Sequence, residues 1–217
     1  MSGPDLGARL ADMLEQRPPA YRALLAEIAA HLAATAVADC LRPGDAMPDF
    51  VLPDAEGRLV SSAALTADGP VVVVFTRGGW CPFCSTTLAA LNDVVDDLAA
   101  LGVRLVALSP DAAGHGQETA RGLALRFPLL SDIDCAVGLR FGVVYRIPQA
   151  YRAILLTYDI DLAARHGDGP GLLPMPATFI AGRDGVLRFA EASGDITRRV
   201  EPARLVGLVA EKQALLF

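Results

Sequence analysis

The sequence predicts an α/β fold in which a central mixed β-sheet is flanked by helices and preceded by a helical arm. Residues 71–75 are continuously apolar, which is typical of a central strand covered on both faces. A helical pattern and a second apolar strand at 103–108 follow, so we expect a β-α-β unit with parallel strands and a right-handed crossover. Near the C-terminus, strands at 177–181 and 186–190 flank the turn residues 182–185, which predicts an antiparallel hairpin.

The N-terminal residues 5–41 are predicted to be helical. Leu6, Leu10 and Leu14 share one helical face, and the apolar pattern resumes after a break at Pro18. Turn residues at 42–45 then close this segment. We therefore divide the chain into a helical arm, 1–42, and a main domain, 43–217, and expect the arm to pack on that domain or on a partner subunit.

The main domain begins with a small predicted hairpin, because residues 50–52 and 58–60 flank turn residues. The helix after the central strand should end at Gly102, and Pro202 suits the first turn of the final helix. Residues 142–173 form an insertion that mixes tyrosines with a glycine-rich loop at 167–171 and has no clear pattern. Shorter elements are expected between these parts: helices at 117–125 and 136–141 and a strand at 127–130. This order of elements is thioredoxin-like.

The composition excludes several classes of protein. The 217 residues are 53% hydrophobic and 20% charged, as in a well-packed globular chain. A net charge of -6 argues against binding to nucleic acid or to an anionic membrane. No apolar run approaches the ~20 residues that cross a bilayer, and the N-terminus has no secretory pattern, so we expect a cytoplasmic protein. The mean hydropathy of +0.38 suggests that some apolar surface is buried in a homodimer.

The segment Trp80-Cys81-Pro82-Phe83-Cys84 places two cysteines where a buried strand turns into a helix. Pro82 fits the first helical turn, so Cys81 should stand at the helix entrance, where the helix amides favour a thiolate. We expect its sulfur to face solvent and Cys84 to lie nearer the core, as an attacking and a resolving thiol. Trp80 is expected to cover the site, and Arg77 to add positive charge.

Other readings of the cysteines are weaker. A zinc site needs about four ligands, and the remaining candidates show no paired spacing, so we expect neither a metal nor a cofactor. Those candidates are Cys40, Cys135, His31, His115 and His166. We expect the two further cysteines to be small buried apolar residues, and His115 and His166 to be solvated in loops. In a thioredoxin-like fold, Pro176 would be cis and face the cysteine pair.

The chain from Arg42 to Pro202 resembles the peroxiredoxin-like branch of the alkyl hydroperoxide reductase/thiol-specific antioxidant family. The most specific match is Arg77-Gly78-Gly79-Trp80-Cys81-Pro82-Phe83-Cys84, and Phe127-Pro128-Leu129-Leu130-Ser131-Asp132 supports it. This resemblance implies a thioredoxin-like fold and peroxide reduction, with recycling by an external thiol donor such as thioredoxin or glutathione. Asp195, Thr197, Arg199 and Glu201 also match the family pattern, and we expect them to cap the last helix or line the site.

The chain also departs from the family pattern. Cys84 falls at the peroxide-reactive position, but Cys81 replaces a threonine, Arg77 replaces a proline, and Pro176 stands where an arginine helps to hold the peroxide. Two functions therefore stay open. Peroxide reduction would begin at Cys84, whereas thiol–disulfide exchange with a disulfide substrate would begin at Cys81. A non-enzymatic redox sensor is a third, weaker alternative.

Overall fold

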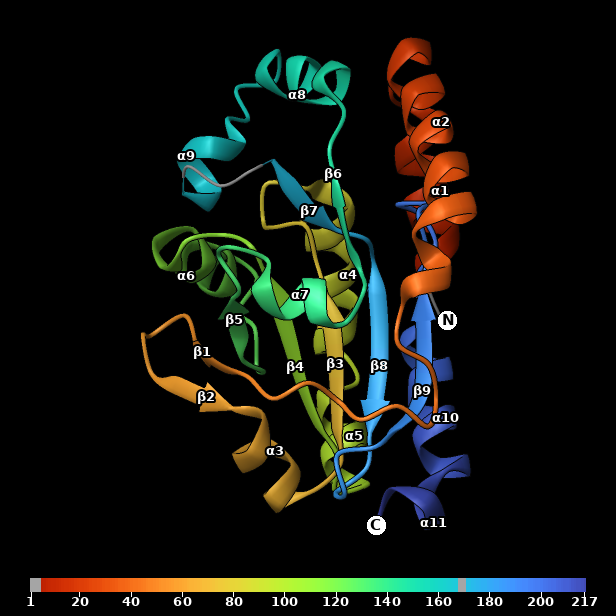
Figure 1. Ribbon diagram of the computed structural model, residues 1–217, viewed down its shortest axis with the longest axis vertical. Helices are drawn as coiled ribbons and strands as arrows, with labels where there is room; N and C mark the ends of the chain where they lie inside the picture. The colour runs from red at the N-terminus through yellow and green to blue at the C-terminus, as the bar shows by residue number, and fades with distance from the viewer. Residues whose placement is uncertain (1–4, 168–170) are drawn as a thin grey trace.

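The computed structural model describes residues 5–167 and 171–217, and it contains the predicted mixed sheet (Figure 1). The central strand β3 pairs in parallel with β4 and antiparallel with β8. β4 and β5 are parallel, and β8 and β9 form the predicted C-terminal hairpin. The order across the sheet is β5 (Leu129–Ser131), β4 (Arg104–Ser109), β3 (Val71–Phe75), β8 (Ala177–Ala181) and β9 (Leu187–Ala192).

Helices cover both faces of this sheet because the apolar side chains of β3 alternate between them. Val72 and Val74 pack in one core cluster with apolar residues of α4 (Pro82–Asn92), α5 (Val95–Ala100) and α10 (Pro202–Glu211). Val71, Val73 and Phe75 belong to a second cluster on the opposite face, which includes residues of α3 (Ser62–Asp68) and α7 (Ala136–Arg140). The prediction of a strand buried on both faces is confirmed.

The helix after β3 is interrupted, whereas the sequence predicts one continuous helix. Asn92 explains the break between α4 and α5: its amide group donates to the Ala124 carbonyl and accepts from the backbone N–H of Arg126. The backbone carbonyl of Asn92 accepts a hydrogen bond of 2.6 Å from the Arg126 guanidinium. This bond competes with the backbone N–H group that would bind the same carbonyl in a continuous helix. Gly102 follows α5 with φ +74°, as predicted for its C-terminal cap.

The smaller elements are close to their predicted places. The hairpin of β1 (Val51–Pro53) and β2 (Leu59–Ser61) is present, and α6 (Ala113–Gly122) begins four residues before its predicted start. The 142–173 segment forms an antiparallel pair of strands and two short helices, and residues 168–170 of its predicted loop lie outside the described residues. These elements are β6 (Val144–Arg146), α8 (Gln149–Leu156), α9 (Leu162–His166) and β7 (Leu172–Pro174). None of the helices in the described ranges is both long enough and apolar enough to cross a membrane.

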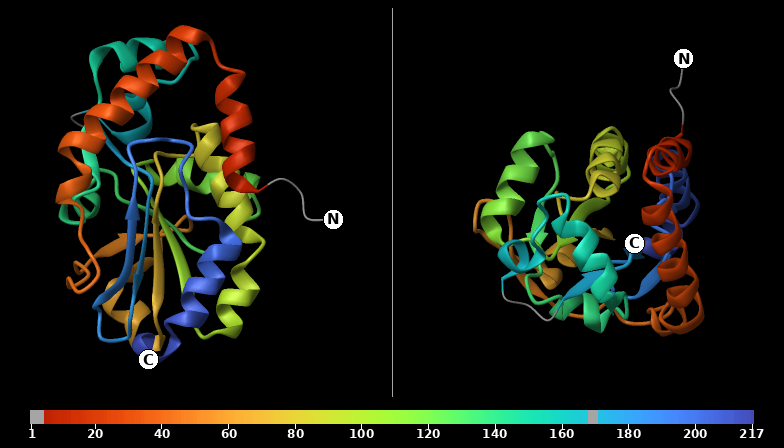
Figure 2. Two further views of the ribbon diagram at one scale, coloured as in Figure 1. Left: turned by 90° about the vertical axis from the view of Figure 1, so that its right-hand side faces the viewer. Right: turned by 90° about the horizontal axis from the view of Figure 1, so that it is seen from above.

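The N-terminal arm consists of α1 (Leu6–Glu15), α2 (Pro19–Thr35) and a short 3₁₀ turn, η1 (Val37–Asp39). Figure 2 shows α1 beside α4, and the Thr86 hydroxyl of α4 contacts the Met13 sulfur at 3.5 Å. Glu201 precedes α10, and we expected it to cap that helix or line the site, but its carboxylate caps α1 instead. It accepts hydrogen bonds from the backbone N–H groups of Leu6 and Gly7 at 2.9 and 2.6 Å, since these first-turn amides have no partner within α1.

This long-range cap leads to a stability prediction. Replacing Glu201 by alanine should lower the free energy of unfolding by about 1–3 kcal/mol, because two part-buried N–H groups lose a charged acceptor. Chemical denaturation measures the loss, and the same change at Glu211, an exposed residue at the end of α10, is the control. Equal stability of the two variants would contradict the assigned cap.

Candidate active site

The two cysteines lie at the junction between β3 and α4. Pro82 occupies the first turn of α4 and Cys81 the N-cap position, as predicted. Gly78 allows the chain to turn here, since it has φ +120° and its carbonyl accepts from the backbone N–H of Cys81. The backbone N–H of Gly79 donates to the buried Asp111 carboxylate at 2.7 Å, which fixes the loop to the end of β4.

Both sulfur-bearing side chains are buried, so the prediction of a solvent-facing Cys81 is wrong. The exposed fraction is 0% for Cys81 and 1% for Cys84. The helix entrance itself would leave Cys81 open, but the 142–173 segment lies over it. Tyr151 of α8 and Tyr145 of β6 are buried there against Arg77, whose charge acts on both phenols.

Arg77 is the largest fully buried side chain among the described residues, with an exposed fraction of 1%. One terminal nitrogen donates to Cys81 Sγ at 2.9 Å, and the other donates to the Tyr151 hydroxyl at 2.7 Å. Its guanidinium carbon lies 5.5 Å from the ring centroid of Trp80, so Trp80 covers the site as expected. Within the described part of the chain no carboxylate forms an ion pair with Arg77, and its Nε has no hydrogen-bond partner.

A buried cation without a carboxylate needs another anion, because removing a charge from water is costly unless it is paired. Cys81 Sγ is the atom placed to supply that charge. Burial alone would raise the pKa of Cys81, but the hydrogen bond from Cys84 and the positive charge of Arg77 outweigh it and hold the pKa well below its ordinary value. These surroundings therefore favour the thiolate form of Cys81.

Cys84 has the opposite character. Its hydrogen bond to Cys81 and its burial raise the pKa of Cys84 well above the ordinary value, because its thiol proton is held against the Cys81 sulfur. The backbone N–H of Arg77 lies 3.4 Å from Cys84 Sγ, and a guanidinium nitrogen of the partly buried Arg199 lies 4.0 Å from it. The surroundings thus favour a thiolate at Cys81 and a protonated thiol at Cys84, which is the division that attack and resolution require.

The side chain of His166 flanks the loop that precedes α4. His166 is buried, so the expectation that it is solvated is wrong: α9 carries its ring against Trp80 and Asp111. The Trp80 Nε1–H group donates to His166 Nε2 at 3.3 Å, and the same nitrogen lies 3.4 Å from an Asp111 oxygen. His115 lies in α6, partly exposed, with Nδ1 3.4 Å from Glu118.

Pro176 does not adopt the predicted conformation. The Met175–Pro176 peptide bond is trans, as are all the other peptide bonds of the described residues. Hydrogen bonds on both sides hold the chain in an extended path, from the Met175 N–H to the Val143 carbonyl at 2.7 Å and from the Ser193 N–H to the Pro176 carbonyl at 3.0 Å. Pro176 is buried directly before β8 and lines a small cleft with Arg199.

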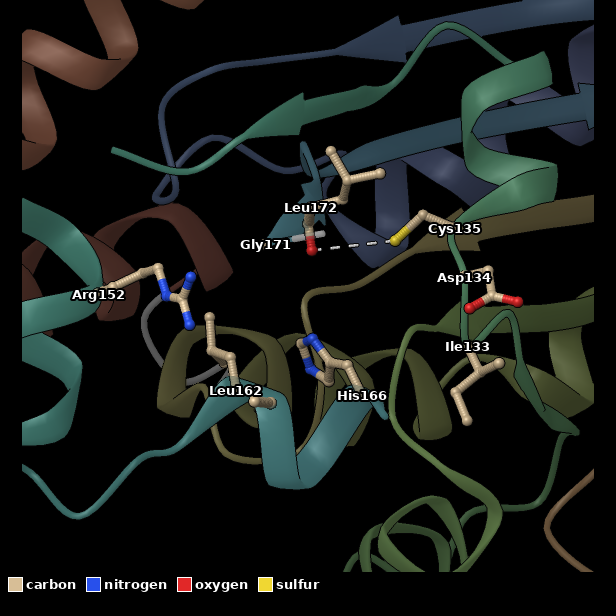
Figure 3. Close-up of a pocket in the computed structure, with 9 residues that line it drawn as sticks. Ile133, Asp134, Cys135, Arg152, Leu162, His166, Gly171 and Leu172 are labelled. Atoms are coloured by element: carbon tan, nitrogen blue, oxygen red, sulfur yellow. Dashed lines mark hydrogen bonds between the residues drawn. The ribbon is translucent and has the colours of Figure 1, made fainter. Parts of the chain in front are cut away.

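The remaining cysteines are buried, as predicted. Burial raises the pKa of Cys40 to about 11 and that of Cys135 to about 12, so both thiols stay protonated. Cys135 lines a pocket with His166 and Arg152, and its sulfur points to the Leu172 carbonyl 4.0 Å away (Figure 3). Among the residues that the structure describes, no group of three or more His, Cys, Asp or Glu side chains could hold a metal ion.

The structure thus brings Arg77, Trp80, Cys81 and Cys84 together, as the sequence indicates. Sequence reasoning missed Tyr151, Asp111 and the placement of His166. The tyrosines of the 142–173 segment were visible as an unexplained aromatic group. Their contact with Arg77 was not, because it depends on how that segment folds back over the loop.

Comparison with known proteins identifies the family of this chain. The model of the AhpC/TSA family matches residues 43–190. A putative peroxiredoxin of Mycobacterium tuberculosis is 31% identical over 103 residues, which cover 48% of this chain and 67% of the relative. Peroxiredoxin Bcp of Escherichia coli is 34% identical over 103 residues, covering 48% of this chain and 65% of that protein.

Solved structures share the fold. Peroxidoxin BcpB of M. tuberculosis superposes with a TM-score of 0.62 at 22% identity, covering 79% of this chain and 97% of that one. Peroxiredoxin Q of Xanthomonas campestris has a TM-score of 0.58 at 18% identity, covering 81% and 96% of the two chains. The match of the family model over most of the sequence shows that this chain belongs to the AhpC/TSA family.

Proposed function

We propose that this chain is a thiol peroxidase in which Cys81 is the attacking thiolate and Cys84 the resolving thiol. The observation that carries the proposal is the buried Arg77 guanidinium, which lies 2.9 Å from Cys81 Sγ and has no carboxylate partner among the described residues. The resemblance alone assigns the attack to Cys84. Attack by Cys81 fits the charge distribution better, because the thiolate is the reactive form of a cysteine.

The reaction proceeds in three steps. The Cys81 thiolate attacks one peroxide oxygen, so an S–O bond forms, the O–O bond breaks, and the leaving oxygen takes a proton to become water or an alcohol. Cys84 then loses its proton and attacks the sulfenic acid sulfur, which forms the Cys81–Cys84 disulfide and releases water. An external thiol donor, for which thioredoxin and glutathione are the candidates, reduces the disulfide and restores the pair.

The alternative is a thiol–disulfide oxidoreductase, and the low pKa of Cys81 also suits that role. Burial favours a small first substrate: with exposed fractions of 0% and 1%, neither cysteine can meet the disulfide of a protein substrate, or thioredoxin in the recycling step, unless the site opens. A small hydroperoxide needs less space to reach a buried sulfur than the disulfide of a protein substrate does. Turnover of insulin or of a mixed disulfide, lost in a Cys81→Ser variant, would instead support exchange.

Peroxide oxidation of two single variants tests the assignment. After stoichiometric hydrogen peroxide, mass spectrometry with a sulfenic-acid trap should find a trapped sulfenic acid at Cys81 in the Cys84→Ser variant. The Cys81→Ser variant should react slowly, since the remaining thiol is protonated. A sulfenic acid at Cys84 would show that Cys84, which stands at the family's peroxide-reactive position, attacks the peroxide. Oxidation of the unmodified protein no faster than that of free cysteine would exclude a peroxidase.

The setting of this reaction follows from the same chemistry. A pair that must be returned to the dithiol suits the cytoplasm, where thiol donors keep cysteines reduced.

The hairpin of β1 and β2 exposes Val51 and Leu59, with exposed fractions of 59% and 73%. We expect a homodimer to cover apolar surface of this kind, and analytical ultracentrifugation measures the oligomeric state.

A further inference from the structure

Tyr151 lies in α8 of the 142–173 segment, far from the cysteines in sequence, yet its side chain is part of their surroundings. It is fully buried, and its hydroxyl accepts a hydrogen bond of 2.7 Å from the Arg77 guanidinium. The Arg77 guanidinium carbon also lies 5.8 Å from the Tyr151 ring centroid. The phenol thus contacts the group that neutralises the Cys81 thiolate, and the proposed reaction leaves this contact without a role.

Few polar atoms hold the Arg77 side chain in place. One terminal nitrogen binds Cys81 Sγ and the other binds the Tyr151 hydroxyl, while Nε has no partner within the described ranges. The aromatic face of Trp80 restrains the guanidinium but does not fix its rotation. Among the described residues, the Tyr151 hydroxyl therefore accepts the shortest hydrogen bond of this guanidinium, and the buried Tyr145 phenol also interacts with it.

Tyr151 is itself held firmly. Its ring packs against the ring of Tyr21 in α2, with centroids 6.2 Å apart, and Tyr21 also contacts the ring of Tyr158. The arm and the 142–173 segment thus support the phenol from two sides. A side chain packed in this way can set the position of a partner, because little rotamer freedom remains.

We propose that Tyr151 is a positioning residue, which orients the Arg77 guanidinium toward Cys81 and so determines that Cys81, rather than Cys84, carries the negative charge. The 142–173 segment is on this account part of the active site as well as its cover. The inference rests on the proposed function, in which the charged thiol is the attacking one.

The physical consequence of losing the phenol oxygen is direct. A Tyr151→Phe variant keeps the ring and its packing against Tyr21 but removes the acceptor that lies 2.7 Å from one buried guanidinium nitrogen. The guanidinium then turns toward another acceptor, and its hydrogen bond to Cys81 Sγ weakens. A hydrogen bond to a charged group contributes enough that its loss should shift the pH profile of Cys81 upward by about one unit, which is about a tenfold loss of thiolate below that range.

The test is the pH dependence of alkylation by iodoacetamide, with mass spectrometry to count the label on Cys81. It is run on the reduced full-length protein, on Tyr151→Phe and on the control Tyr158→Phe, whose ring contacts Tyr21 and is 43% exposed. We expect the profile of Tyr151→Phe to move upward and that of Tyr158→Phe to coincide with the unmodified protein. Thermal unfolding of each variant is measured alongside.

The outcomes separate this inference from the proposed function. An unchanged profile for Tyr151→Phe, or an equal shift in the control, overturns the positioning role, and a lower melting temperature without a shift marks Tyr151 as merely structural. Alkylation needs no peroxide, so the shift can be observed even if the protein fails to reduce peroxides. Conversely, the Tyr151→Phe variant could reduce peroxide rapidly with an unchanged pH profile of Cys81 alkylation. That result would support the peroxidase function and contradict the positioning role of Tyr151.

Discussion

Replacing Arg77 by methionine is expected to slow oxidation by hydrogen peroxide about 10- to 100-fold near neutral pH. Arg77 is the cation in contact with Cys81 Sγ, at 2.9 Å, and both side chains are buried. A charge-assisted hydrogen bond contributes about 1.5–3 kcal/mol, which corresponds to that range of rates when it controls the thiolate fraction. Stopped-flow measurement of single-turnover oxidation gives the rate. Because the thiol can still ionise in alkaline solution, the deficit should shrink as the pH rises.

Three further arginine variants sharpen this prediction. Arg77→Lys keeps the charge but not the two-pronged geometry, so its rate should lie between those of Arg77→Met and the unmodified protein. Arg198→Met removes an exposed cation next to the site and is the control. Arg199→Met removes the guanidinium that lies 4.0 Å from Cys84 Sγ. If Arg199→Met slowed the reaction and Arg77→Met did not, the attack would belong to Cys84.

The Cys81→Ser variant should be much less stable than the Cys84→Ser variant, although the two cysteines are equally buried. Removing the Cys81 thiolate leaves Arg77 as a buried cation without an anion, a defect that costs about 3–5 kcal/mol in buried ion pairs. The pKa of Cys84 is held well above its ordinary value by its hydrogen bond to Cys81 and by burial, so its replacement is expected to leave the charge pair in place. Chemical denaturation of the reduced proteins measures both losses, and equal losses would contradict a thiolate at Cys81.

The pH dependence of this difference follows from the sign of the pKa shift. The pKa of Cys81 is lower in the folded protein than in the unfolded chain, where a thiol titrates near about 8.5. Its contribution to stability is therefore fully present above the unfolded value and is lost as the pH falls through the folded value. The stability gap between the unmodified protein and Cys81→Ser should be largest in mildly alkaline buffer and narrow on acidification. A gap that does not depend on pH would exclude this origin.

Much of the fold could be predicted because it depends on local pattern. The four valines and phenylalanine of β3 indicate a strand buried on both faces, and Pro82 and Gly102 mark the two ends of the helical region that follows. The split between α4 and α5 was not predictable in this way. It arises from hydrogen bonds between Asn92 and the distant residues Ala124 and Arg126.

The site shows the same boundary between local and long-range effects. The spacing of Cys81 and Cys84 and the proximity of Arg77 are properties of one loop and one helical turn, so they were accessible from the sequence. The burial of Cys81, the burial of His166 and the trans bond before Pro176 were predicted wrongly. Each depends on contacts between parts of the chain that are distant in sequence: those of the 142–173 segment with the loop before α4 for the first two, and the pairing of the chain around β8 for the third.

The sequence by itself determined that this protein has a thioredoxin-like sheet with two cysteines at the entrance of the helix after its central strand. It could not determine which of the two carries the charge, because that depends on the position of one guanidinium. Only the tertiary structure places Arg77 between Cys81 Sγ and the Tyr151 hydroxyl and, within the described residues, leaves it without an ion pair to a carboxylate. In a buried site the Coulomb energy between two charges changes steeply over a few ångströms of separation. Which cysteine carries the charge therefore depends on how distant parts of the chain pack, and the spacing of the cysteines does not reveal it.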